Sequence, residues 1–376
     1  MSNEIRNIKK SIRFEQIMFD TTRFAYYVPT LSFSFEHDIR TRLQRLHLRA
    51  QRSFISLQSM PYYPYTINDV PTIFREPFII HGYRSDHKPW SYYWQSLFHK
   101  HNETINVWSH MTGILYIIYL LYYYNQRLNF MENSHSWPFV VSLCTAIIMF
   151  MCSAFAHLLH SKSDSIHRTC FAIDYVGVSL HGFGSGFLHI YYSAPQWYYN
   201  KIEYEYIFIL LILAIFACFF NCFAQYYYSR PYPPMKRICQ FLPCGILWIY
   251  SVIPLLIRLF PIQFPLDITS MCHVGQLIFF VIGAILFAFD IPQRFCPGTF
   301  DFIGQGHQLF HLCIYFVTIC QMHGVYWDYE ASRTIIDQRA KPDLIFCAGS
   351  MICLILWNIV SVCFFRYWLR EKEHVH

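Results

Sequence analysis

Three histidines in this sequence have the spacing of a zinc site. His307 and His311 are four residues apart in HQLFH, so a helix would present both imidazoles on one face, within reach of one ion. Ser153 and His157 have the same spacing in SAFAH. Three histidines with an open fourth position are typical of a catalytic zinc, whereas a structural zinc usually has four protein ligands. The sequence therefore predicts a Zn2+ ion bound by His157, His307 and His311.

A zinc ion of this kind could support hydrolysis. The metal lowers the pKa of a bound water towards about 7. Asp174 would then orient this water or act as a general base, or its carboxylate would accept a hydrogen bond from a ligand histidine. Ser153 would hydrogen-bond the water or a substrate carbonyl. In the competing interpretation, these histidines are hydrogen-bonded packing residues and bind no metal.

The other histidines in apolar segments are weaker candidates. His160 follows His157 by three residues and could replace it as a ligand. His181 and His189 lie farther along the apolar segment that contains Asp174, and they could line a cavity. His323 lies towards the far end of the segment that begins at His307, and we expect it to be structural.

Membrane-spanning helices must position these residues, because the composition excludes an ordinary soluble protein. Hydrophobic residues make up 55% of the chain and charged residues 14%, against about 25% charged residues in soluble domains. A helix of roughly 20 apolar residues can cross a bilayer. We predict an all-α membrane protein with eight such spans, at 105–124, 138–160, 170–192, 205–223, 239–260, 273–290, 307–326 and 344–365.

The distribution of positive charge predicts how these spans are oriented. Of the 29 Lys and Arg residues, 14 lie in residues 1–104, which we therefore expect to be cytoplasmic. The charged N-terminus is not followed by the apolar core of a signal peptide, so the first span is expected to direct insertion. The basic loop before the last span does not follow the charge bias: either the count of eight spans is right and this loop is an exception, or one span is miscounted. Because the positive charge lies beside the membrane, it does not indicate a nucleic-acid partner.

This topology places the polar residues at one depth. The second span ends at the cytoplasmic side with Ser153 and His157. The third span begins there with Asp174, and the seventh begins there with His307 and His311. Polar residues inside spans are costly and usually functional. Three spans far apart in the sequence therefore contribute to one predicted site at the cytoplasmic end.

The chain is expected to have three parts: a cytoplasmic and interfacial region at 1–104, the helical bundle at 105–365 and a cytoplasmic tail at 366–376. Within the first part, RTRLQRLHLRAQR is either an amphipathic helix on the membrane surface or a solvated charged face. Residues 61–104 are rich in Pro, Tyr and Trp, which predicts a non-helical, interfacial segment. Asn102-Glu103-Thr104 matches a glycosylation sequon, but capping and hydrogen bonding at the foot of the first span is the expected role.

Several long motifs resemble signature stretches of the progestin and adipoQ receptor family. These motifs are HNETINVWSHMTG (101–113), SAFAHLLHSKS (153–163), DYVGVSLHGFGSG (174–186) and GHQLFH (306–311). Three further segments and the eighth span resemble the membrane progestin receptor branch of that family. The segments are REPFIIHGYR (75–84), RPYPPMKRICQ (230–240) and DYEASRTIIDQR (328–339).

The resemblance implies a core of seven helices, with the N-terminus inside the cell and the eighth helix added to it. Adiponectin receptors of this family hold zinc with three histidines, whose positions match His157, His307 and His311. Their Asp near the bound water matches Asp174, and the Ser of their S-x-x-x-H motif matches Ser153. The resemblance also implies a plasma-membrane receptor for a progestin-like steroid or related lipid that signals through a heterotrimeric G protein. The alternative it implies is a zinc-dependent hydrolase of ceramide-like amides, because alkaline ceramidases in the wider superfamily have similar motifs; its ligand would be a sphingolipid.

Overall fold

The computed structural model describes residues 38–46, 63–230, 232–260 and 266–375, with side chains to residue 368. The chain divides into two compact units, Met1–Leu46 and His47–His376. In the first unit, residues 38–46 form a helix in which Arg42 Nε lies 2.8 Å from Asp38 Oδ2. This helix includes the first part of RTRLQRLHLRAQR. The remainder of that predicted amphipathic segment lies outside the described residues.

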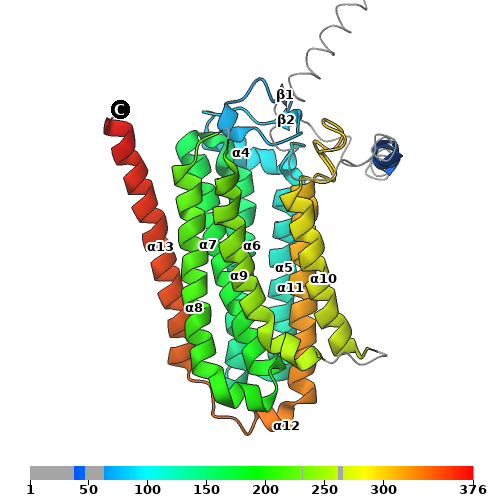
Figure 1. Ribbon diagram of the computed structural model, residues 1–376, viewed down its shortest axis with the longest axis vertical. Helices are drawn as coiled ribbons and strands as arrows, with labels where there is room; N and C mark the ends of the chain where they lie inside the picture. Colours follow the sequence, from blue (N-terminus) through cyan, green and yellow to red (C-terminus); the bar gives the residue numbers. More distant parts are fainter. Residues whose placement is uncertain (1–37, 47–62, 231, 261–265, 376) are drawn as a thin grey trace, which may run out of the picture. The chain divides into compact units, whose positions relative to one another are not determined.

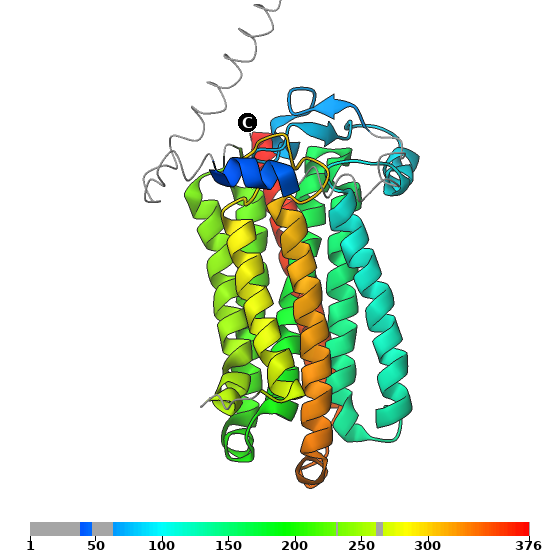
Figure 2. The same cartoon turned by 90° about the vertical axis from the view of Figure 1, so that its right-hand side faces the viewer.

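Eight long helices of the second unit run along one bundle (Figures 1 and 2). They are α5 (Thr104–Leu128), α6 (Trp137–Leu159), α7 (Asp164–Leu188), α8 (Gln196–Tyr227), α9 (Pro234–Leu259), α10 (Ile268–Ala288), α11 (Gly306–Ala331) and α13 (Leu344–Val375). Each of the eight predicted spans lies largely on one of them. Among the described residues, seven helices are long and apolar enough to cross a membrane, and α7 is the long helix that falls short. The prediction of an all-α membrane protein is confirmed, while the count of eight crossings stays a prediction.

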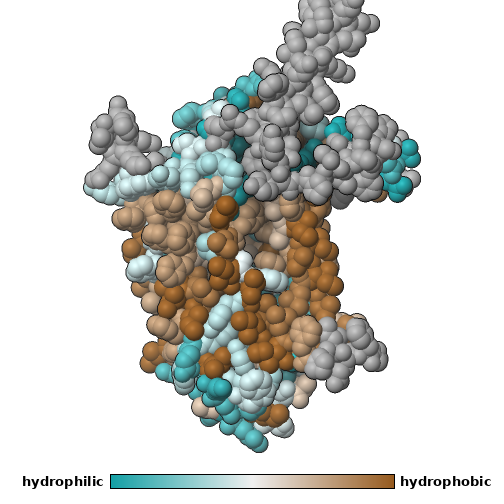
Figure 3. All heavy atoms as spheres, viewed as in Figure 1, coloured by the Kyte–Doolittle hydropathy of each residue, from teal (hydrophilic) through white to brown (hydrophobic). Residues whose placement is uncertain are grey.

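The outer surface of the bundle is apolar, as contact with a lipid bilayer requires. Large apolar side chains point outwards from several helices, among them Leu115, which is 68% exposed, and Phe208, which is 64% exposed. Figure 3 shows a broad hydrophobic band along the helices, with hydrophilic residues at the two ends. A soluble monomer rarely exposes a contiguous apolar patch of this extent. The chain is therefore a multi-pass integral membrane protein.

Helix α7 can be more polar than the other long helices because protein surrounds much of it. It packs against α6, α8, α9 and α13. Small residues let these neighbours approach closely: a Cβ on Gly177 would lie 2.8 Å from the Met149 Cα of α6, and one on Gly182 would lie 2.5 Å from the Leu247 side chain of α9. Polar residues on α7 can thus find partners within the bundle, which lipid could not provide.

A short strap covers the end of the bundle where α5 begins. It contains an antiparallel pair of strands, β1 (Tyr65–Thr66) and β2 (His81–Tyr83), followed by helix α4 (Trp90–Gln95). The 3-10 helices η2 (Thr72–Phe74) and η3 (Ser96–Phe98) complete it. The prediction that residues 61–104 are non-helical is therefore wrong for HKPWSYYW, where Pro89 precedes α4 and its fixed φ suits a helix start.

The C-terminal helix α13 ends on the same side of the bundle as α4 and the two strands (Figures 1 and 2). The short helix α12 (Arg333–Ile336) lies at the opposite end. Each long helix reverses the direction of the chain. After eight long helices, the chain therefore returns to the end of the bundle at which α5 begins. The strap and the end of α13 therefore share one face of the bundle. That this face is cytoplasmic stays a prediction.

Substitution of a helix-contact glycine should destabilise the bundle. In Gly177→Ala, the new methyl group would meet backbone of α6, so the two helices must separate, at a cost of about 1–3 kcal/mol. We expect the midpoint of thermal unfolding in detergent to fall by several degrees. Gly245→Ala is the matched control, because a Cβ there meets nothing within 4 Å and alanine favours a helix. Equal midpoints for the two variants would contradict the close packing of α6 and α7.

The orientation can be checked by labelling single added cysteines with a membrane-impermeant maleimide. Met131, which is 88% exposed, lies in the turn between α5 and α6. Asn68 is exposed in the strap at the other end. With the N-terminal region in the cytoplasm, Met131→Cys should react in intact cells and Asn68→Cys only after permeabilisation. The unsubstituted chain gives the background from its own cysteines, and the reverse labelling pattern would overturn the orientation.

Candidate metal centre

The last turn of α6 and the first two turns of α11 bring the three predicted ligands together. His157 lies near the C-terminal end of α6, and His307 and His311 follow the start of α11 at Gly306. A Cβ on Gly306 would lie 2.6 Å from the backbone carbonyl oxygens of Leu286 in α10 and of Ile291 shortly after it, so only glycine fits this close approach. The Gly306 N–H donates to Gln293 Oε1 at 2.7 Å. These contacts fix where α11 begins, and hence the height of its histidines.

The ring nitrogens of the three histidines converge. His307 Nε2 lies 3.2 Å from His157 Nε2 and 3.1 Å from His311 Nε2. One donor atom from each residue falls within 4.8 Å of the other two. A tetrahedral zinc with Zn–N distances near 2.0–2.1 Å separates its nitrogen ligands by about 3.3 Å. The donor set and its spacing therefore fit a zinc ion, and His307, which is only partly buried, leaves one side of the group accessible.

Glu103 orients one of these histidines. Its Oε2 lies 2.8 Å from His157 Nδ1, and the Asn106 side-chain amide donates to the same oxygen. Glu103 and His157 are 4% and 2% exposed, so this contact is shielded from solvent. When Nδ1–H donates to the carboxylate, the lone pair of His157 is left on Nε2, where it faces the other two histidines. Glu103 thus fixes the tautomer that metal binding needs.

The sequence interpretation missed this role of Glu103. It assigned the HNET motif to helix capping and hydrogen bonding, and Glu103 occupies the N-cap of α5 without making a side-chain capping hydrogen bond. The expected hydrogen bonding at the foot of α5 is present, but it is directed to His157 of α6. One signal could have found it: an acidic residue at the predicted depth of the histidines requires a partner. Asn102 of the sequon is 4% exposed, which agrees with an unused site.

Arg84 of the strap holds the end of α6. Its guanidinium donates to the backbone carbonyls of His157, at 2.7 Å, and of Leu158. It also donates to Ser96 Oγ at 3.0 Å. The last carbonyls of a helix lack intrahelical partners and carry partial negative charge, so a buried arginine stabilises this end. Burial lowers the pKa of Arg84 below its usual value, and the nearby Glu103 carboxylate opposes this effect.

Three further hydrogen bonds fasten the strap and the HNET segment to the loop between α10 and α11. Asp301 accepts the backbone N–H groups of Ile80, at 3.0 Å, and His81, at 2.8 Å. Burial raises the pKa of the Asp301 carboxyl, although these hydrogen bonds favour its charged form. The Gln305 side chain donates to the Asn102 carbonyl at 2.6 Å. Segments at the start of α5 and before α11 are therefore joined beside the histidines.

Ser153 and Asp174 lie beside the three histidines without joining the group. The Ser153 hydroxyl of α6 hydrogen-bonds the Asp174 carboxylate of α7, and the His157 side chain interacts electrostatically with that carboxylate. Ser153 is 3% exposed, whereas Asp174 keeps part of its surface accessible. The structure thus brings all five predicted site residues to one end of the bundle. Their predicted roles towards a bound water stay predictions.

The alternative histidines have other partners. His160 Nδ1 lies 3.2 Å from His167 Nδ1, and its Nε2 faces Glu103 at 3.9 Å, so it is not part of the three-histidine group. His323 lies between the hydroxyls of two α5 tyrosines, at 3.0 and 2.9 Å, as a structural residue would. The buried ring of His110, which the sequence interpretation did not consider, stacks on His311 with ring centroids 4.0 Å apart.

Comparison with known proteins extends the similarity over most of the chain. Residues 98–322 match the family model described as Haemolysin-III related. The chain is 35% identical over 298 residues to membrane progestin receptor beta of Homo sapiens, covering 75% of this chain and 81% of that protein. The Mus musculus protein of the same name is 35% identical, with coverage of 84% and 91%. Membrane progestin receptor alpha-B of Danio rerio is 32% identical, with coverage of 89% and 96%.

Removal of the Glu103 carboxylate should weaken metal retention. Without an acceptor at Nδ1, His157 no longer keeps its lone pair on Nε2, and loss of such a partner typically lowers metal affinity ten- to 100-fold. We expect Glu103→Ala to release zinc to a chelator correspondingly faster, as measured by elemental analysis of the purified protein. Glu103→Gln keeps an acceptor oxygen and should recover most of the affinity. Equal zinc content and release in all three chains would show that Glu103 has no such role.

Proposed function

This chain belongs to the Haemolysin-III related family, which includes the progestin and adipoQ receptors, and we propose that it is a multi-pass membrane receptor for a progestin-like steroid. The observation that carries the proposal is the similarity to membrane progestin receptors at 32–35% identity over most of the chain. We place this receptor in the plasma membrane with its N-terminal region in the cytoplasm. A heterotrimeric G protein is the proposed partner on that side.

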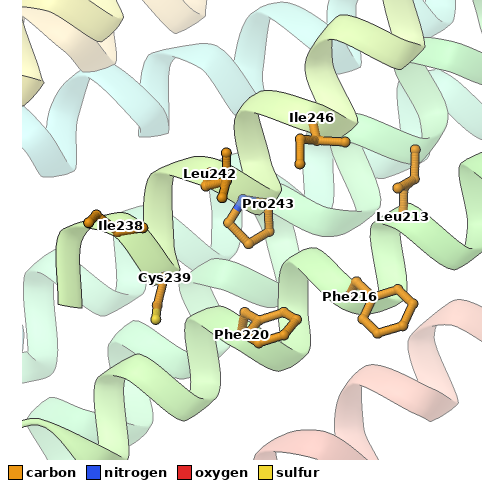
Figure 4. A pocket seen from close by; sticks show the side chains of 8 residues that line it. All are labelled: Leu213, Phe216, Phe220, Ile238, Cys239, Leu242, Pro243 and Ile246. Carbon is orange, nitrogen blue, oxygen red and sulfur yellow. The ribbon is translucent and has the colours of Figure 1, made fainter. Parts of the chain in front are cut away.

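The apolar groove between α8 and α9 is not where we place the ligand. It has a volume of about 310 Å3 and is lined by apolar side chains and Cys239 (Figure 4). Several of these side chains, such as Phe216 and Leu242, are among the exposed residues of the outer surface, so the groove faces lipid. It lacks the few polar groups that orient a specific ligand. Lipid chains would fill it, whereas polar groups that could select a steroid lie inside the bundle.

We propose that His157, His307 and His311 bind Zn2+ and that Glu103 supports them. When bound, the zinc would hold α6 and α11 together and would be able to lower the pKa of a bound water. Binding of a metal to the folded site alone contributes stability to the fold. In the receptor, this centre would fix the cytoplasmic ends of two helices against which a ligand is held.

A zinc-dependent hydrolase of ceramide-like amides is the alternative function. The observation that favours it is the Ser153–Asp174 pair beside the histidines. Asp174 is partly accessible, as a residue that acts on water or substrate must be. In this alternative the ligand is a sphingolipid and the chain is an enzyme. The same three histidines serve both functions, so the outcome depends on whether a substrate is turned over.

Binding and turnover assays on one purified preparation separate the two functions. We expect saturable progesterone binding and no metal-dependent release of fatty acid from ceramide. His307→Ala should lose most of its zinc, because only two ligands remain, and should unfold at a lower temperature. His323→Gln is the matched control, a histidine of the same helix outside the centre, and should keep its zinc. Chelator-sensitive ceramide hydrolysis that is absent from His307→Ala would establish the enzyme instead, and absence of steroid binding would refute the receptor.

A further inference from the structure

Two stripes of polar side chains run along facing sides of α7 and α11. On α7 the residues follow one another at helical spacing, which places them on one face. They are Asp174, His181 and Ser185, and His189 continues the stripe directly after the end of α7. On α11 a second set has similar spacing and begins with the histidines of the metal centre: His307, His311, Thr318, Gln321 and Asp328. Ionisable and polar residues at this depth in a membrane bundle usually mark a binding site or pathway.

The stripes meet in the half of the bundle away from the metal centre. Thr318 Oγ1 lies 3.3 Å from His181 Nε2. One turn farther, the Gln321 side-chain amide donates to Ser185 Oγ and lies 3.3 Å from His189 Nε2. These contacts form a second polar cluster, which we define as His181, Ser185, Thr318 and Gln321.

An apolar interval of fixed length separates this second polar cluster from the metal centre. Both helices run away from the centre, so residue numbers on the two increase in the same direction. His181 lies seven residues beyond Asp174, and Thr318 lies seven residues beyond His311. Seven helical residues extend about 10 Å. The residues between them on these faces are apolar, Val178 on α7 and Ile314 on α11.

The facing surface of α7 is not fully covered by its neighbours. Asp174, Val178, His181 and Ser185 all keep part of their surface accessible, although α7 packs against four other helices. A side chain in a filled interior would keep almost none. The polar, apolar, polar sequence along this face is therefore not completely covered by neighbouring side chains.

Two acceptor atoms in the second polar cluster lack partners. Thr318 Oγ1 lies 3.0 Å from the Ile314 carbonyl, which takes its hydroxyl proton. Thr318 therefore accepts from His181 Nε2–H, and the lone pair of His181 is on Nδ1. Among the residues that the structure describes, neither His181 Nδ1 nor Gln321 Oε1 has a hydrogen-bond partner, and both atoms are buried. An unpaired buried polar atom costs about 1–3 kcal/mol, so both atoms favour a ligand that donates a proton.

We propose that the second polar cluster is the subsite for the oxygen at one end of a steroid, and that it prefers a hydroxyl; this inference rests on the proposed receptor function. A steroid is a rigid apolar frame with an oxygen at each end, which matches two polar groups separated by an apolar wall. One end of the ligand lies at Asp174 and the histidines. The other end donates its hydroxyl proton to His181 Nδ1. A ketone at that end binds less well, because Thr318 must first turn its proton from Ile314 to His181.

The experiment measures competition binding to the full chain with two series of steroids. Each series varies one end of the frame, from hydroxyl to ketone to no oxygen, while the other end stays constant. In the series that varies the end lying at the second polar cluster, we expect the steroid with a hydroxyl to bind about tenfold more tightly than the steroid without oxygen. One buried hydrogen bond would give such a ratio. His181→Phe should reduce this ratio to below about twofold. Ser179→Ala, on the same helix but directed at α8, is the control and should keep the ratio.

Thr318→Val tests the tautomer without removing the imidazole. The valine has the shape of threonine but cannot accept from His181, so either ring nitrogen can carry the proton. The preference for hydroxyl over ketone should disappear, while the preference for an oxygen over none remains. A thermal unfolding midpoint for each variant shows that it is folded. If His181→Phe is unfolded, the result for Thr318→Val decides whether the second polar cluster is the subsite.

Failure of the subsite and failure of the receptor function would give different binding results. If the unsubstituted chain binds steroids but both variants keep its selectivity in both series, the second polar cluster is not the subsite and the receptor function stands. If the unsubstituted chain binds no steroid, the receptor function fails and the subsite with it. Selectivity lost in His181→Phe and Thr318→Val but kept in Ser179→Ala is the result that supports the proposal.

Discussion

The contact between Glu103 and His157 joins the parts of the molecule that bring the three histidines together. A carboxylate in a buried position is costly unless it is paired and hydrogen-bonded. Here the partners are His157 of α6 and the Asn106 amide of α5. The neighbouring Asn102 carbonyl receives Gln305, just before α11. The start of α5, the end of α6 and the start of α11 are therefore held by one small network, and the tautomer of His157 depends on it.

The membrane imposes a second constraint, which α7 satisfies. Lipid offers no hydrogen-bond partners, so a helix with Asp174 and His181 must be surrounded by protein. The glycines of α7 allow α6 and α9 to approach closely and provide that surrounding. This arrangement explains why α7 falls short of the hydropathy of a span although it runs along the bundle with the others. Its polar face is directed inwards, where a ligand or a metal can use it.

The sequence was sufficient to predict the bundle and the convergence of the three histidines, because both depend on regular quantities. Apolar length gives the helices, and alternation of direction gives the depth of His157 and His307. The strap was not predictable in this way: the contacts of Arg84 with α6 join segments without shared periodicity. Helix α4 was missed because Pro, Tyr and Trp in HKPWSYYW equally suit an interfacial loop. Glu103 was missed because helix capping offered a sufficient local explanation.

A receptor and a hydrolase built on this centre would use binding free energy differently. A hydrolase needs the scissile bond at the metal, so the rest of the substrate must only position it. A receptor needs a ligand whose affinity differs between two arrangements of the helices. A rigid ligand held at both ends by α7 and α11 meets this need, because any shift between the two helices changes the fit at one end. Since α11 is continuous from His307 to Asp328, a shift at the second polar cluster would be transmitted to the three histidines, where α6 and the strap are attached.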